Sequence, residues 1–164
     1  MYQWLVFAHI LGIFGFLLAH GSAAGVAFKL RGEREIPRVR ALLDLSSSVT
    51  TVASVSLLTL LVAGVILGFM GHWWGQGWIW ISLGLFVLMG VSMMGLGTQP
   101  FKRIRQVIAL ADPSSAPKGA QPLTIEEVEK RLPALLEGIH PMLLTITSGS
   151  GLAIILWLMM FKPL

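Results

Sequence analysis

Long uncharged stretches divide this chain. No Asp, Glu, Lys or Arg occurs in residues 1–28, 45–101 or 141–161. A membrane-crossing helix needs about 20 apolar residues, so the outer two stretches suit one crossing each and the middle one suits two. Glycines and three tryptophans interrupt the middle stretch between residues 71 and 78. Because glycine permits a turn and tryptophan is enriched at membrane–water interfaces, we predict spans at about 3–28, 46–70, 78–98 and 141–161.

The composition supports a membrane protein. The 164 residues are 55% hydrophobic and only 12% charged, whereas soluble domains are about 25% charged. The length leaves room for one domain, residues 1–164, which we predict to be an all-α integral membrane antiparallel four-helix bundle. Two GxxxG pairs, Gly21 with Gly25 and Gly64 with Gly68, are typical of close helix packing in membranes. Cysteine is absent, which excludes disulfides and thiolate metal sites.

The positive charges predict an orientation. Eleven of the twelve basic residues lie in two connections, 29–44 and 102–138. Because cytoplasmic loops carry an excess of Lys and Arg, we predict that both connections face the cytoplasm and both termini lie outside it. The net charge of +4 therefore does not indicate nucleic-acid binding. The basic residues expected to contact anionic lipid headgroups are Arg31, Arg34, Arg38, Arg40, Lys102, Arg103 and Arg105.

A short amphipathic helix is predicted before the fourth span. Residues 112–122 read as a linker rich in Pro, Ser and Ala, and Thr124 then forms a capping box with Glu127. Pro133 is expected to kink the helix. We expect the segment 124–138 to lie along the cytoplasmic membrane surface or to lead at an angle into the fourth span. The apolar residues on one of its sides are Ile125, Val128, Leu132 and Leu135.

Four histidines carry the candidate chemistry. His9 and His20 are eleven residues apart in the first span, which places them on one helix face about 16 Å apart. An ionisable side chain within a span is costly and calls for a polar partner. Counting residues from each connection pairs His20 with His140 in the cytoplasmic half and His9 with His72 in the outer half. Neutral imidazole is a common ligand of metals and of haem iron.

Two interpretations of these histidines stay open. Each pair could share haem b or a transition-metal ion such as copper, as facing helices of bundles do, or each ring could simply hydrogen-bond a neighbouring hydroxyl or carbonyl group. Hydroxyl side chains cluster at the predicted depth of His20 and suggest a polar cavity open to the cytoplasm. They could equally bond to their own helix backbone. The candidate supporting residues are Ser47, Thr51, Thr145 and Ser148.

The first span also carries a family resemblance. The sequence Trp-Leu-Val-Phe-Ala-His-Ile-Leu-Gly, residues 4–12, precedes a basic connection. This arrangement resembles small bacterial membrane proteins of the copper-resistance D-like type and a related group of four-span proteins of unknown function. The resemblance implies a bacterial inner membrane protein with His9 as a copper or haem ligand.

Three functions follow as hypotheses. The first is a haem-binding or metal-binding protein, active in electron transfer with quinone. The second is a non-catalytic accessory subunit that packs in the lipid bilayer against other membrane subunits or further copies of itself. The third, a transporter that uses the polar cavity, has less support. The sequence contains no Ser–His–Asp set, phosphate-binding loop or HExxH motif, so it predicts no hydrolase or kinase activity.

Overall fold

The chain folds into helices. The computed structural model describes residues 1–111 and 121–163, and no strand occurs within these ranges. A 3-10 turn and a π-helical turn, written η1 and η2, accompany six α-helices. The elements are α1 (Tyr2–Gly32), α2 (Ile36–Met70), η1 (Trp73–Gly75), α3 (Gly77–Met93), η2 (Met94–Thr98), α4 (Gln99–Ala109), α5 (Ile125–Glu137) and α6 (Pro141–Phe161).

Among the described residues, four helical segments are long and apolar enough to cross a membrane, the same number as the spans expected from the sequence. Two of them coincide with α1 and α2. The third joins α3, η2 and α4 into one run, Gly77–Ala109, and the fourth joins α5 and α6, Ile125–Phe161. The described part of the chain is therefore an all-helical protein whose apolar surface suits contact with lipid.

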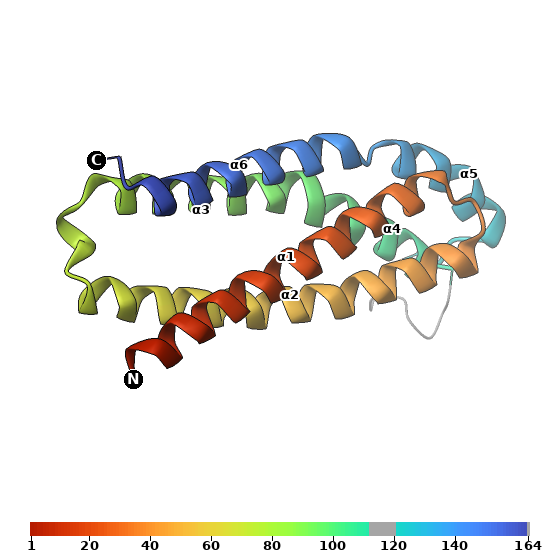
Figure 1. Ribbon diagram of the computed structural model, residues 1–164. Helices are drawn as coiled ribbons and strands as arrows, with labels where there is room; N and C mark the ends of the chain where they lie inside the picture. The colour runs from red at the N-terminus through yellow and green to blue at the C-terminus, as the bar shows by residue number, and fades with distance from the viewer. Residues whose placement is uncertain (112–120, 164) are drawn as a thin grey trace.

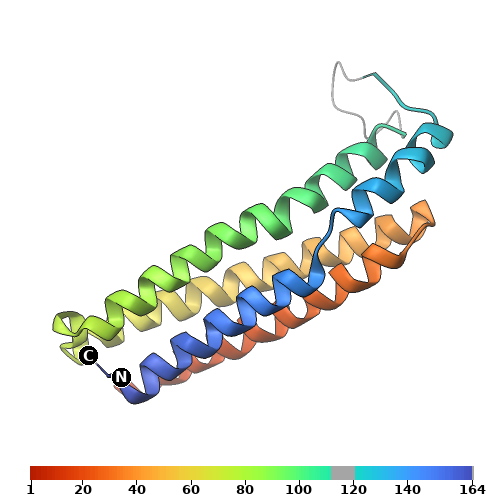
Figure 2. The same cartoon turned by 90° about the horizontal axis from the view of Figure 1, so that it is seen from above.

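The four long segments lie in two layers. Figure 1 shows α1 and α2 in one layer, and α3 and α6 in the other, with α6 above α1 and α3 above α2 in Figure 2. Both termini lie at the end that holds η1. We call this the tryptophan end, after Trp73, Trp74 and Trp78, and the opposite end the basic end, after Lys29, Arg31, Lys102 and Arg105.

Glycine sets the close approach of α1 and α2. Gly12 is buried, and a Cβ atom added there would lie 2.8 Å from the backbone nitrogen of Leu60. Small residues allow such contacts in membranes, where lipid removes the usual hydrophobic drive for helix association. The two predicted GxxxG pairs differ in whether another helix packs against them. Gly64 receives the ring of His9, whereas Gly21 and Gly25 have open space where a side chain would be.

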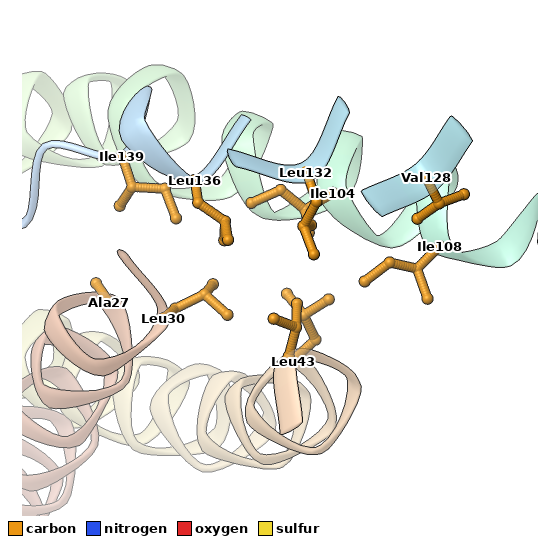
Figure 3. Packing of buried hydrophobic residues seen from close by; sticks show 10 residues of the cluster. Ala27, Leu30, Leu43, Ile104, Ile108, Val128, Leu132, Leu136 and Ile139 are labelled. Carbon is orange, nitrogen blue, oxygen red and sulfur yellow. The ribbon is translucent and has the colours of Figure 1, made fainter. Parts of the chain in front are cut away.

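The best-packed core lies at the basic end, where α5 meets the ends of α1, α2 and α4 (Figure 3). The capping box between Thr124 and Glu127 is present, as predicted. Of the predicted apolar side, Val128 and Leu132 are buried and Leu135 packs partly buried against the cluster, whereas Ile125, the first residue of α5, is 63% exposed. Leu136, which was not predicted, is fully buried. The cluster comprises Ala27, Leu30, Val39, Leu43, Ile104, Ile108, Val128, Leu132, Leu136 and Ile139.

The helices extend beyond the predicted spans. α1 and α2 leave only residues 33–35 between them, with Pro37 in the first turn of α2. Proline suits this position because its missing N–H has no partner there in any helix. The charges of the predicted connection 29–44 therefore lie mostly on helix ends. Residues 112–120 of the predicted linker lie outside the described residues.

Candidate functional site

A cavity of about 590 Å³ lies between the two layers, in the half of the protein nearer the basic end. Its wall combines α1 and α2 from one layer with α3, η2, α4 and α6 from the other. His20 is the histidine among the lining residues. Ligand sites of proteins are typically cavities of roughly 300–1,000 Å³, mostly apolar, with few polar groups. The size and lining of this cavity match that description.

Small side chains leave this space open. Ala19, Ala23 and Ala27 follow helical spacing on α1 and line the cavity from one side. Ala53 of α2 and Gly90 of α3 line it from others. A residue with a longer side chain at these positions would extend into the space between the layers. The sequence feature that leaves the cavity open is therefore a row of small residues on one face of α1, opposite small residues on α2 and α3.

His20 occupies the wall with a defined partner. Its ring is half-buried and stacks on Phe16 at 6.0 Å between ring centroids. Its Nε2 atom lies 2.6 Å from the Oγ atom of Ser148, which is buried on α6. Ser148 has one hydroxyl hydrogen, and its Oγ also lies 2.7 Å from the carbonyl oxygen of Leu144. When Ser148 donates to that carbonyl, Nε2 of His20 must be the protonated nitrogen.

Three of the candidate hydroxyl residues lie at the wall of the cavity. They are Ser47, Thr51 and Thr145. Thr51 and Thr145 also donate to their own helices, to the carbonyl oxygens of Ser47 at 3.2 Å and of Pro141 at 2.9 Å. Their hydroxyl hydrogens are therefore occupied, and their oxygen lone pairs remain available as acceptors.

The structure does not bring His20 and His140 together. His140 is exposed and stands at the start of α6. Ser148, the partner of His20, is eight residues further along α6, or about 12 Å along the helix axis. Along the bundle axis His20 therefore lies at the same height as Ser148, and not at the height of His140. Glu137, which has Glu-x-x-His spacing to His140, is exposed as well.

His9 has a fixed orientation near the tryptophan end. Its Nδ1 atom lies 2.8 Å from the carbonyl oxygen of Leu60, to which it must donate, and its ring packs where Gly64 lacks a side chain. The Nε2 atom then carries the lone pair. His72 is exposed in the turn after α2, with φ at 53°. It follows Gly64 by eight residues, so the outer pair is also not brought together.

Metal-binding groups are sparse. Among residues 1–111 and 121–163, no group of three or more His, Asp and Glu side chains is close enough to hold one ion. Because the histidine pairs expected from the sequence are also apart, a metal or haem iron at His9 or His20 would need further ligands such as a thioether or an external molecule. Met89 and Met93, which line the cavity beside His20, are the thioethers nearest such a role.

The basic residues differ in their surroundings. Lys102 and Arg105 line the cavity at its basic end. Arg105 is held by Asp44 at 2.9 Å and by the carbonyl oxygen of Leu43 at 2.6 Å. Arg38 pairs with Glu35 on the exposed start of α2. The positions predicted to contact headgroups therefore include two, on α4, that also face the cavity.

Comparison with protein-family models, with curated proteins and with solved structures found no match. Sequence reasoning missed Phe16, the alanine face of α1 and the cavity position of Lys102. The alanines carried a readable signal, because small residues recur at helical spacing from Ala19 to Ala27. Lys102 carried no such signal, because its sequence surroundings are the same as those of any lysine that follows a membrane span and sets its orientation.

Proposed function

We propose that this chain is a multi-pass protein of the bacterial cytoplasmic membrane, an antiparallel bundle with its basic end and α5 on the cytoplasmic side. The asymmetry of the basic residues supports this orientation. Reporter fusions test it, because a reporter that is active only outside the cytoplasm should work at both termini. Cytoplasmic activity from a fusion at the C-terminus would overturn the orientation.

We further propose that the protein binds a membrane-soluble, largely apolar ligand in the cavity between its layers. The observation that carries this proposal is the cavity itself, about 590 Å³ of space bordered by His20. Within a bilayer such space would be reached by molecules dissolved in the lipid. The His20 ring offers them a polar contact at its Nδ1 atom, because Ser148 occupies Nε2.

Two glycines of α3 provide a matched test. Gly90 lines the cavity and Gly84 does not, and neither has a neighbouring atom where a Cβ would be placed. Protein purified from native membranes in mild detergent should retain a ligand that mass spectrometry of the extract detects. Gly90→Leu should remove most of that ligand and Gly84→Leu should leave it in place. Equal retention in both variants, or no ligand in the unaltered protein, would refute this function.

A second candidate, haem b or copper bound through His9, is favoured by one observation. The hydrogen bond from Nδ1 of His9 to Leu60 orients the ring and leaves Nε2 free, which is the arrangement found for metal-bound histidines. Haem or copper would supply one-electron transfer. The resemblance of residues 4–12 to copper-resistance D-like proteins is consistent with this candidate.

Visible absorption of the protein from native membranes tests the second candidate. A bound haem should give an absorption band that His9→Ala abolishes and His72→Ala preserves, because His72 is exposed in the turn. A copper ion should show the same dependence in metal analysis. A colourless protein without metal would overturn it. If the cavity also proves empty, an accessory subunit with structural histidines is the remaining function.

A further inference from the structure

The cavity extends along the helices. Along α2 its lining runs from Leu43 to Leu57, and fourteen residues of helix span about 21 Å. This length, parallel to the helices, suits a flexible acyl chain.

The described charged residues that line the cavity are all basic and lie at one end of it. Lys102 and Arg105 line its basic end, and no Asp or Glu is among the lining residues that the structure describes. Arg105 is fixed by Asp44, which offsets its charge. Lys102 is exposed, and no ion pair joins it to a residue within 1–111 or 121–163. Among the lining residues that the structure describes, Lys102 of α4 is therefore the cation without a partner carboxylate.

The depth of Lys102 fits the level of lipid headgroups. It is the first charged residue after the uncharged run 45–101, so it lies where the apolar surface ends. Basic pockets between transmembrane helices on the cytoplasmic side are a known setting for anionic headgroups. The apolar part of the cavity continues from this point toward Leu57 and Phe86, in the direction that a lipid chain would follow.

We propose that the cavity binds an anionic phospholipid of the cytoplasmic leaflet, with one acyl chain between the layers and the phosphate group at Lys102. This inference rests on the proposed ligand-binding function and names its ligand class. The chain displaces no protein contact, because small residues leave the space open. The phosphate oxygens accept hydrogen bonds from the ammonium group of Lys102. They also accept from those N–H groups of Arg105 that are not already bonded to Asp44 and Leu43.

Native mass spectrometry of the full-length protein tests the proposal. Delipidated protein in detergent is titrated with dioleoyl phosphatidylglycerol, dioleoyl phosphatidylcholine or oleate. We expect phosphatidylglycerol to bind about fivefold more tightly than phosphatidylcholine, the effect of one basic residue at a membrane surface. Lys102→Gln should remove that preference. Arg103→Gln is the matched control, since Arg103 is exposed and does not line the cavity. Its loss can remove only the general attraction of a surface charge for anionic headgroups, so most of the preference for phosphatidylglycerol should remain.

The outcomes separate this inference from the function on which it rests. Equal losses in Lys102→Gln and Arg103→Gln would show diffuse charge attraction and overturn the headgroup site. Oleate binding in place of phosphatidylglycerol would overturn the phospholipid source. If both phospholipids bind equally and Gly90→Leu blocks both, the ligand-binding function stands and its anionic specificity fails. If Gly90→Leu leaves the preference for phosphatidylglycerol intact, the chain does not lie in the cavity.

Discussion

Substitution of Gly12 by alanine tests how α1 and α2 are held together. The added Cβ would lie 2.8 Å from the backbone nitrogen of Leu60 and 3.0 Å from its Cα, whereas ordinary contacts begin at 3.4 Å. Because the nearest atoms include backbone, α1 must move away instead of a side chain rotating. Overpacking of this kind costs about 1–3 kcal/mol, and the higher helix propensity of alanine offsets up to about 1 kcal/mol of it. We therefore expect a net loss of up to about 3 kcal/mol, and of about 1–3 kcal/mol relative to an alanine substitution on α1 that meets no neighbour.

Gly21→Ala on the same helix is the control, because nothing lies within 4 Å of the Cβ that it adds. Thermal unfolding in detergent micelles, followed by the fluorescence of the six tryptophans, compares the two variants. Gly12→Ala should lower the midpoint by several degrees, since 1 kcal/mol corresponds to about 2–4 °C for a chain of this size. Gly21→Ala should leave it unchanged or slightly raised. A midpoint for Gly12→Ala at or above that of the control would refute the close packing of α1 on α2.

Other predictions concern the basic end. Leu132→Ala should destabilise the protein by about 2–5 kcal/mol in chemical unfolding, because Leu132 is 1% exposed within the core cluster. Thr124→Ala should cost about 1 kcal/mol through loss of the α5 cap, and faster amide exchange confined to the first turn of α5 would report it. The backbone N–H groups of Arg34 and Glu35 donate to Glu33 and lower the pKa of its carboxyl group. The ionised Glu33 side chain therefore stabilises this turn at pH values above the ordinary glutamate pKa. The stabilisation is lost as the pH falls through the lowered pKa of Glu33. An NMR titration that places the Glu33 pKa at or above the ordinary value would contradict it.

The sequence was a good guide to what depends on composition along the chain. The number of spans, the capping box at Thr124 and the turn at the tryptophan end all follow from local patterns, and the structure contains each of them. These features need no knowledge of how helices rotate against each other. Local chemistry was sufficient because an apolar span or a cap involves residues that are neighbours in sequence.

The site was harder to predict because it depends on depth and rotation together. The predicted level of His20 assumed that the helix ends near residue 28, whereas α1 continues to Gly32 and α2 begins at Ile36. In the structure His20 contacts Ser148, eight residues further along α6 than His140. Rotation adds a second uncertainty, since one residue turns the helix by about 100°. This explains why Leu136, and not the predicted Leu135, is the fully buried residue on this part of α5.

The distribution of packing within the bundle argues that the cavity serves binding. Where the layers must hold, the chain uses large apolar residues, as in the cluster around Leu132 at the basic end, or direct helix contact, as at Gly12. Where the cavity lies, alanine, serine and glycine stand between larger lining residues such as Phe16, Leu57 and Phe86. In water an open apolar space of this size would favour collapse of the layers onto each other. In a bilayer lipid chains can fill it, and helices gain little from displacing them. Small side chains on the cavity face of α1 thus leave room for a lipid-soluble molecule, while the basic-end core and the α1–α2 contact hold the walls in place.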